Sequence, residues 1–216
     1  MLSASIQELR VGTSDYKAAQ SIAKRFGTLP YQDDYGGTRD CAKGYFERCA
    51  YRIGSNLGSI HNRPSLRRMG FRDWEATGFI YIESGTVQDY SFSVIYETSD
   101  GKWRGFGAEE AKRLPEDRAV QARISESYSV ERNDIRLGER TIDLGFDLEA
   151  SLTPASTPDE RQQAWHFKLK CLSDQHGCGE ICEVMPDAWR DFYNQRGRLD
   201  VEKYGSAYLF CTKPAI

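Results

Sequence analysis

The sequence predicts an α+β protein built mainly from an antiparallel β-sheet, with an N-terminal helix, a short C-terminal helix and disulfide-tethered loops. Three observations predict this class: one early segment with helical spacing of apolar residues, several later segments that alternate apolar and polar residues, and six cysteines in two groups. Hydrophobic residues make up 39% and charged residues 28% of the 216 positions, as in ordinary globular proteins. The chain can hold two domains, 1–110 and 111–216, or one continuous domain.

The N-terminal helix is expected at residues 13–27, TSDYKAAQSIAKRFG. Thr13 or Ser14 can accept hydrogen bonds from N–H groups of the first turn, and Gly27 suits the left-handed position that ends many helices. Its apolar residues recur at helical spacing and form one face: Ala19, Ile22, Ala23 and Phe26. We expect this face to lie in the core.

The C-terminal helix is expected at residues 186–197, PDAWRDFYNQRG. Pro186 is suited to a first helical turn, and Gly197 is suited to a helix end. Between these two helices the chain should be mostly strands and loops.

The clearest strand signal is a hairpin at residues 77–97, where two runs rich in β-branched and aromatic residues flank Ser84-Gly85. In the segment 164–172 we expect His166 to be an exposed strand histidine and not a ligand, because it lies opposite Trp165 and Phe167. Further strands are expected at 49–60, 120–130, 141–148, 164–172 and 205–211.

The cysteines fall into a close pair, Cys41 and Cys49, and a later cluster, Cys171, Cys178, Cys182 and Cys211. Short loops favour the pairs Cys41–Cys49, Cys171–Cys178 and Cys182–Cys211, each stabilising by roughly 2.5–3.6 kcal/mol in the chain-entropy model. An even number of cysteines is easier to explain in an oxidising compartment, so we expect a periplasmic or secreted protein. The N-terminal MLSASIQELR has no apolar segment of signal-peptide type and gives no sign of export by itself.

A zinc site is the alternative for the later cluster, with Cys171, His176, Cys178 and Cys182 as ligands, and free buried thiols are a third reading. Structural zinc sites favour paired C-x2–4-C knuckles, which this spacing does not provide. We therefore favour disulfides and expect no metal and no cofactor. No C-x-x-C pair supports redox activity.

Charge and hydropathy argue against nucleic acid as a partner and against a transmembrane segment. Lys plus Arg number 29 against 32 Asp plus Glu, a formal net charge of −3, so we expect no broad attraction to nucleic acid. The apolar run of roughly 18 residues that a transmembrane helix needs is missing.

Catalytic motifs are also missing: we find no P-loop, no dinucleotide-binding glycine pattern, no HExxH and no G-x-S-x-G. The loop at 28–43 is rich in Gly, Asp and Tyr and would be tethered by Cys41–Cys49, so its rigid tyrosines suit a binding surface. Next to the following strand lies the most basic run of the chain, beside His61. The candidate binding residues are Tyr31, Tyr35, Tyr45, His61, Arg63, Arg67 and Arg68.

The order VGTSDYKAAQSIAKRFG, a loop, CAKGYFERC, a strand and FIYIESGTVQDYSF resembles the β-lactamase-inhibitor-protein fold and its relatives, the small lipoproteins of outer-membrane barrel assembly. In that family a Gly-Met-Thr-type turn opens the helix; here Gly12-Thr13-Ser14 stands there, and Ser84-Gly85-Thr86-Val87 takes the hairpin position. The resemblance covers residues 6–97 and departs from the pattern in the missing Met, a longer loop and a basic insertion at 61–72. It implies a non-enzymatic, extracytoplasmic binding protein whose sheet and loops form the contact surface.

The sequence therefore favours a protein-binding or inhibitory module that contacts another protein. The alternative is a small hydrolase or phosphate-ester-acting enzyme that uses His61 with the nearby arginines Arg63, Arg67 and Arg68. That alternative requires the imidazole and guanidinium groups to converge in one concave pocket.

Overall fold

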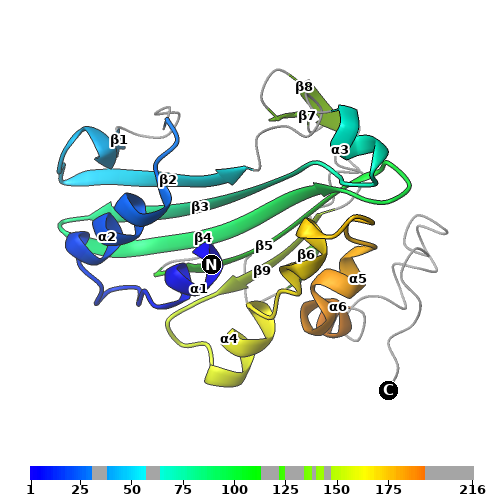
Figure 1. The fold of residues 1–216 in the computed structure, drawn as a ribbon. Coiled ribbons are helices and arrows are strands. Elements are labelled where there is room, and N and C mark those ends of the chain that lie inside the picture. The colour runs from blue at the N-terminus through cyan, green and yellow to red at the C-terminus, as the bar shows by residue number, and fades with distance from the viewer. Residues whose placement is uncertain are drawn as a thin grey trace.

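The computed structural model shows an α+β protein, as the sequence predicts, with one large and mostly antiparallel sheet, helices at both ends of the described chain and disulfide bonds (Figure 1). It describes residues 1–30, 38–56, 64–112, 122–124, 134–137, 140–143 and 147–192. None of the described helices has the length and apolar character that a bilayer span requires.

The helices and strands follow one another in mixed order along the chain. The helices are α1 (Leu2–Gln7), α2 (Tyr16–Phe26), α3 (Pro64–Arg68), α4 (Pro158–Ala164), α5 (Ile181–Val184) and α6 (Pro186–Phe192), with 3₁₀ turns at Cys41–Lys43 and Leu169–Ser173. The strands are β1 (Arg39–Asp40), β2 (Arg48–Asn56), β3 (Trp74–Glu83), β4 (Thr86–Glu97), β5 (Trp103–Ala111), β6 (Ala122–Ile124), β7 (Asp134–Leu137), β8 (Arg140–Asp143) and β9 (Asp147–Leu152).

The large sheet has seven described strands in the order β1-β2-β3-β4-β5-β9-β6. Its centre, β2 to β5, is an antiparallel meander in which sequential strands are neighbours. Parallel pairs occur between β1 and β2 and between β5 and β9. Strands β7 and β8 form a separate two-stranded sheet.

The predicted hairpin is confirmed. Strands β3 and β4 pair from Glu83–Thr86 outward, and the turn residues Ser84 and Gly85 both have positive φ, 52° and 80°. Two positive φ values in a two-residue loop are typical of the turns whose twist matches that of the strands. The register shifts at Tyr81, which pairs with Asp89, so Gln88 is the extra residue of a bulge.

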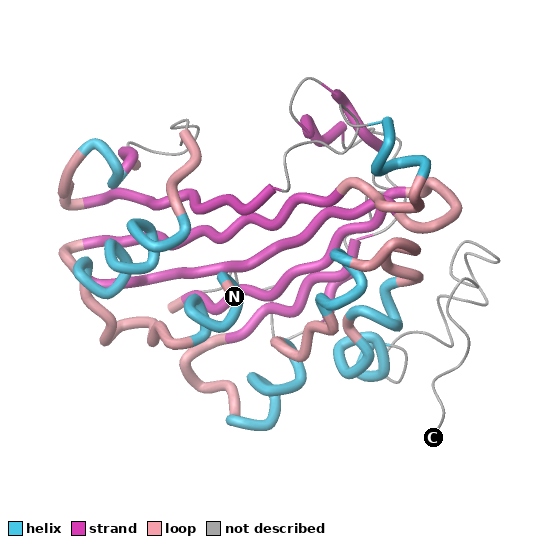
Figure 2. The backbone as a smooth tube through the Cα atoms, in the orientation of Figure 1, coloured by secondary structure: helices cyan, strands magenta, loops and turns pink. Residues whose placement is uncertain are grey.

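One face of the sheet carries the core, and the helices α1, α2, α4, α5 and α6 lie along this side (Figures 1 and 2). In the middle of β3, α1 approaches so closely that a Cβ added to Gly78 would lie 2.4 Å from Ile6 Cδ1. On the next two strands, the ring of Phe167 packs against Phe92, which pairs with Gly78, and against Phe106, with centroids 5.5 Å and 5.4 Å away. Burying such apolar surface is the main contribution to the stability of the fold.

A buried ion pair fixes the C-terminal helices to this core. Arg104 of β5 is 4% exposed in its side chain and binds both carboxylate oxygens of Glu180, at 2.8 Å and 3.3 Å. The hydroxyl of Tyr96 donates to the carbonyl of the neighbouring Gly179 at 3.0 Å. Together these contacts hold the segment before α5 against β4 and β5.

The structure corrects the start of the N-terminal helix. The cap of α2 is Asp15, whose carboxylate accepts from the N–H of Ala18 at 2.9 Å, and not Thr13 or Ser14. The Ser14 hydroxyl instead accepts from the N–H of Arg10, so it belongs to the preceding turn. The helix ends as predicted at Gly27, which has φ 84°.

The strand predicted at 164–172 is wrong. A capping box between Thr157 and Glu160 starts helix α4, which ends at Ala164, and the chain then continues into the 3₁₀ turn Leu169–Ser173. Trp165 and Phe167 do pack in or against the core, but the segment that carries them is not a strand. His166 is exposed, and its Nδ1 lies 2.5 Å from Asp187 Oδ2.

The other predicted elements agree in part. Strand β2, Arg48–Asn56, confirms the prediction over 49–56, and 57–60 lie outside the described residues. Strand β6 falls within 120–130, and the segment 141–148 is divided between β8 and β9. Helix α6 confirms the C-terminal helix over Pro186–Phe192. The strand predicted at 205–211 lies outside the described residues. The elements α1, α3, α4, α5, β1, β5 and β7 were not predicted from the sequence.

Two of the predicted disulfides are confirmed. Cys41–Cys49 and Cys171–Cys178 are bonded, with S–S distances of 2.08 Å and 1.99 Å. Cys182 is also disulfide-bonded, and its predicted partner Cys211 lies outside the described residues. Sulfur atoms bonded to one another are not the thiolates that zinc requires, so the zinc alternative for this cluster is wrong.

Candidate open-face site

The side of the sheet opposite the core carries half-exposed side chains. On β3, residues alternate strictly between the buried core face and this second side, which we call the open face. Residues of the neighbouring strands that pair with these β3 residues lie on the same side. On β4, for example, Asp89 pairs with Tyr81, and Ser91 pairs with Phe79. The open face consists of Arg48, Arg52, Glu75, Thr77, Phe79, Tyr81, Glu83, Asp89, Ser91 and Ser93.

Charged pairs cross the open face between β2 and β3. Arg48 Nε lies 2.7 Å from Glu83 Oε1, and Arg52 Nη2 lies 3.9 Å from Glu75 Oε1. Exposed pairs of this kind stabilise a fold by about 0–1 kcal/mol each. They therefore define the charge pattern of the surface more than its stability.

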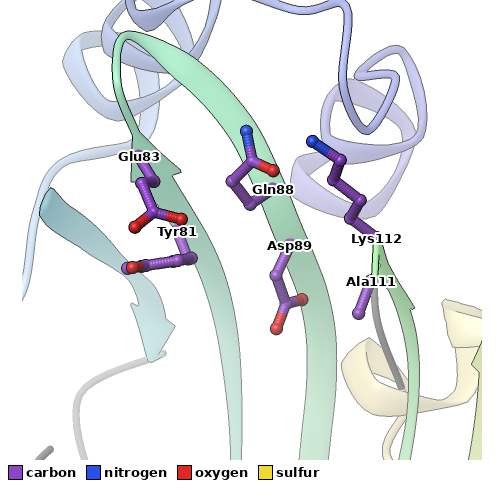
Figure 3. A pocket seen from close by; sticks show the side chains of 6 residues that line it. All are labelled: Tyr81, Glu83, Gln88, Asp89, Ala111 and Lys112. Carbon is purple, nitrogen blue, oxygen red and sulfur yellow. The ribbon is translucent and has the colours of Figure 1, made fainter. Parts of the chain in front are cut away.

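A pocket of about 320 Å³ opens on this face near the β3–β4 turn. Tyr81 and Glu83 come from β3, Gln88 and Asp89 from β4, Ala111 from the end of β5, and Lys112 directly follows it (Figure 3). The bulge places Asp89 opposite Tyr81, and Asp89 also pairs with Ala111, whose methyl group leaves room beside it. The tyrosine thus stands between two carboxylate-bearing residues.

The surroundings of Tyr81 favour its neutral phenol. Burial is the larger cause that raises the pKa of Tyr81, and the nearby Glu83 carboxylate raises it further. Arg48 acts in the opposite direction, because its guanidinium favours the phenolate. Tyr81 therefore keeps its proton at neutral pH, so its hydroxyl can donate a hydrogen bond to a bound partner.

Beside the turn lies the cysteine loop, residues 41–49, which the Cys41–Cys49 disulfide closes. The N–H of Ser84 donates to the carbonyl of Glu47 at 2.7 Å, so this loop is fixed to the hairpin turn. The side chain of Asp40 caps the 3₁₀ turn at the start of the loop by accepting from the N–H of Ala42.

Tyr45 is the exposed aromatic residue of the cysteine loop, with 55% of its surface accessible. Its ring packs edge-on against Tyr16 of α2, with centroids 5.0 Å apart. The Tyr51 hydroxyl donates to the Tyr16 hydroxyl at 3.0 Å, and the N–H of Tyr16 donates to the carbonyl of Gly85. These contacts hold Tyr45 in place while much of its ring stays accessible.

The predicted site residues are only partly brought together. Tyr45 lies on the described cysteine loop, but Tyr31, Tyr35, His61 and Arg63 lie outside the described residues.

The two described arginines of the predicted site lie on α3. Arg67 is half-buried and binds Glu97 at 2.6 Å, and Arg68 is exposed. An acidic partner thus already occupies one guanidinium of the basic run.

The pocket residues were not predicted from the sequence. The alternation in 77–97 carried enough signal to place Tyr81 and Glu83 on one side of a strand. The bulge and the pairing with β5 were not visible in any local pattern, and these two features bring Asp89 and Lys112 to the pocket.

No protein-family model, curated protein or solved structure matches this chain. The geometry of the open face and the cysteine loop is therefore the basis for a functional proposal.

Proposed function

We propose that the protein is an extracytoplasmic, non-enzymatic module that binds another protein through its open face and cysteine loop. The disulfide bonds support an oxidising compartment, periplasmic or extracellular. The resemblance of residues 6–97 to inhibitor proteins that bind through a sheet points in the same direction.

One observation carries this proposal: the pocket of the open face and the rigidly held, exposed Tyr45 lie at the same end of the sheet, beside the Ser84-Gly85 turn. A solvated sheet face alone is common in antiparallel proteins. Here the end of the sheet that carries the pocket also carries Tyr45, whose loop is fixed by a disulfide bond and by the Glu47–Ser84 hydrogen bond. Aromatic residues that are already ordered lose little conformational entropy on binding, and for this reason they are frequent in protein interfaces.

The pocket favours a polar or basic side chain of the partner. Asp89 contributes a carboxylate, Glu83 contributes a second one that already pairs with Arg48, and Lys112 contributes one ammonium group. A cationic side chain next to the Tyr81 ring can gain both ion-pair and cation–π contacts.

The enzyme alternative gains no support from the described residues. Arg67, one of its proposed groups, is held by Glu97 in an ion pair and so is committed to a structural contact. His61 and Arg63 lie outside the described residues.

The proposal is tested by site-specific cross-linking. A photoreactive phenylalanine analogue replaces Tyr45 or Tyr81 on the binding side, or the exposed Lys24 of α2 as the control, and each variant is incubated with the extracytoplasmic fraction of the source cells. We expect one protein to be cross-linked from Tyr45 and Tyr81 but not from Lys24. That protein is then purified, and its Kd is measured by titration calorimetry.

Substitutions then separate binding from folding. Tyr45→Ala and Tyr81→Ala should each raise the Kd about tenfold or more, as truncation of an interface aromatic does, while Lys24→Ala leaves it unchanged. The free energy of unfolding of Tyr45→Ala should stay within about 1 kcal/mol of wild type, because the ring is largely exposed. Cross-links from Lys24 alone, or an unchanged Kd in both tyrosine variants, would refute the proposal.

A further inference from the structure

A second cavity lies on the opposite side of the sheet, between α1 and the 3₁₀ turn Leu169–Ser173. Its volume is about 290 Å³, and its lining is mostly carbon. Leu2 and Phe26 contribute from the helices, Ala76 and Phe92 from β3 and β4, and Leu172 from the turn. These residues belong to or border the hydrophobic core, so the cavity opens into the apolar layer and not onto the open face.

Trp74 of β3 also lines this cavity, and its indole N–H is buried. No acceptor for this N–H exists in the part of the chain that the structure describes. An indole nitrogen can only donate a hydrogen bond, and leaving such a donor unsatisfied costs about 1–3 kcal/mol. An oxygen atom of a bound molecule would remove this cost.

The apolar lining argues against water as that partner. A buried water molecule needs two to four polar contacts, and sites lined by Leu and Phe stay dry or bind apolar molecules. The hydroxyl of Ser173, at the edge of the cavity, already donates to the carbonyl of Lys170 at 2.9 Å. The wall therefore suits a largely apolar molecule with one acceptor atom.

From this combination we propose that the cavity binds a neutral medium-chain amphiphile whose oxygen accepts a hydrogen bond from Trp74. A water molecule's share of liquid volume is about 30 Å³, so the cavity has room for roughly ten non-hydrogen atoms. This size matches an alkyl or acyl chain of about eight carbons with one hydroxyl or carbonyl oxygen. A neutral acceptor is favoured, because burial of a carboxylate among these carbon atoms carries a large desolvation cost.

The experiment follows the indole N–H signals of the four tryptophans by ¹H–¹⁵N NMR. The signal of Trp74 is assigned from the Trp74→Phe variant, and the probes are 1-octanol, toluene and dihexanoylphosphatidylcholine. We expect 1-octanol to shift the Trp74 signal downfield in a saturable manner. The lipid ester tests whether an acyl chain of a lipid fills the same site, and toluene fills the cavity without an acceptor.

Two variants separate the hydrogen bond from the cavity itself. Trp74→Phe keeps a ring but removes the donor, so the Kd for 1-octanol, read in wild type and variant from the backbone amide signals of Ala76 and Leu172, should rise about tenfold while the Kd for toluene changes little. Ala76→Leu fills the space and should abolish the binding of both probes. Circular dichroism and the unfolding midpoint show whether each variant is folded. The titration of the wild-type protein tests probe binding at Trp74 even if a variant does not fold.

Each contrary result is distinct. A Trp74 signal that no probe moves shows that the cavity is closed or filled by another part of the chain, and it overturns the proposal. Equal affinity of wild type and Trp74→Phe for 1-octanol overturns the role of the indole donor. This site is independent of the open face, so either result leaves the proposed protein binding untouched.

Discussion

The hydroxyl of Tyr90 donates a hydrogen bond to Glu110 at 2.5 Å, and the two residues lie directly opposite each other on β4 and β5. The same carboxylate oxygen binds Arg161 of α4. Arg161 also donates to the carbonyls of Thr153 and Ser156, at 2.8 Å and 3.2 Å. A carboxylate that is 2% exposed thus connects the middle of the sheet to the helix and loop that follow β9.

Removing this carboxylate should destabilise the protein strongly. Glu110→Ala leaves the guanidinium of Arg161 without its ion-pair partner and the Tyr90 hydroxyl without its acceptor, and breaking a buried pair in this way costs about 3–5 kcal/mol. The measurement is urea unfolding followed by circular dichroism. Lys102→Ala, which removes the exposed pair with Asp100 and leaves the Thr98–Asp100 hydrogen bond intact, is the matched control and should cost less than about 1 kcal/mol. Equal losses in the two variants would show that the Glu110 network does not hold α4 in place.

Stability should fall at alkaline pH because of buried tyrosines. Burial is the largest cause that raises the pKa of Tyr90 and of Tyr96, and the nearby Glu110 and Glu180 carboxylates raise them further. In the unfolded chain a tyrosine loses its proton near pH 10, whereas these folded phenols keep theirs. The contribution is therefore complete below about pH 10 and decreases as the pH rises toward the higher folded pKa.

The Tyr96→Phe variant measures how much the ionisation of one of these phenols contributes to the loss of stability. Unfolding free energies measured from pH 9 to 11.5 should fall less steeply in the variant, by about 1.4 kcal/mol per pH unit above pH 10. Tyrosinate absorbance recorded in parallel should show Tyr96 ionising only as the protein unfolds. Identical slopes in the two proteins would mean that the Tyr96 phenol is accessible to hydroxide in the folded state.

The hairpin turn offers a stabilising substitution. Ser84 has φ 52°, a conformation that costs energy for most residues, and Asn tolerates it better than Ser does. Ser84→Asn should raise the free energy of unfolding by about 0.5 kcal/mol, whereas Gly85→Ala, at φ 80°, should lower it by about 1 kcal/mol. Thermal unfolding of the two variants measures both signs, and a less stable Ser84→Asn protein would contradict the proposed turn strain.

The Cys41–Cys49 disulfide should stabilise both the fold and the position of Tyr45. Its residues are 8 apart in sequence, so the Cys41→Ala/Cys49→Ala double variant should lose about 2.5 kcal/mol in the chain-entropy model. Hydrogen exchange should also speed up at the Ser84 amide, which bonds to Glu47 in the loop. The pair Cys171–Cys178, with a separation of 7, is the control: its removal should cost a similar amount but leave the Ser84 amide protected.

Sequence reasoning succeeded where the decisive interactions are local. The Ser84-Gly85 hairpin, the end of α2 at Gly27 and the Cys41–Cys49 pair each depend on residues close together in the chain. It failed at 164–172, where the alternation of apolar and polar residues predicted a strand. There the capping box at Thr157 and Glu160 starts a helix, and Trp165 reaches the core from a turn.

The sequence by itself determined the α+β class, the central hairpin and the close cysteine pairs, because turn chemistry, side-chain alternation and short loop closure act over a few residues. The tertiary structure alone decided which strands became neighbours and therefore which side chains line the pocket and the cavity. Tyr81, Asp89 and Ala111 line one pocket only because of the bulge and the β4–β5 pairing. Trp74 and Leu172 line one cavity only because the C-terminal segment packs on the core. Contacts between distant segments depend on the total burial of the whole chain, and no short stretch of residues specifies that sum.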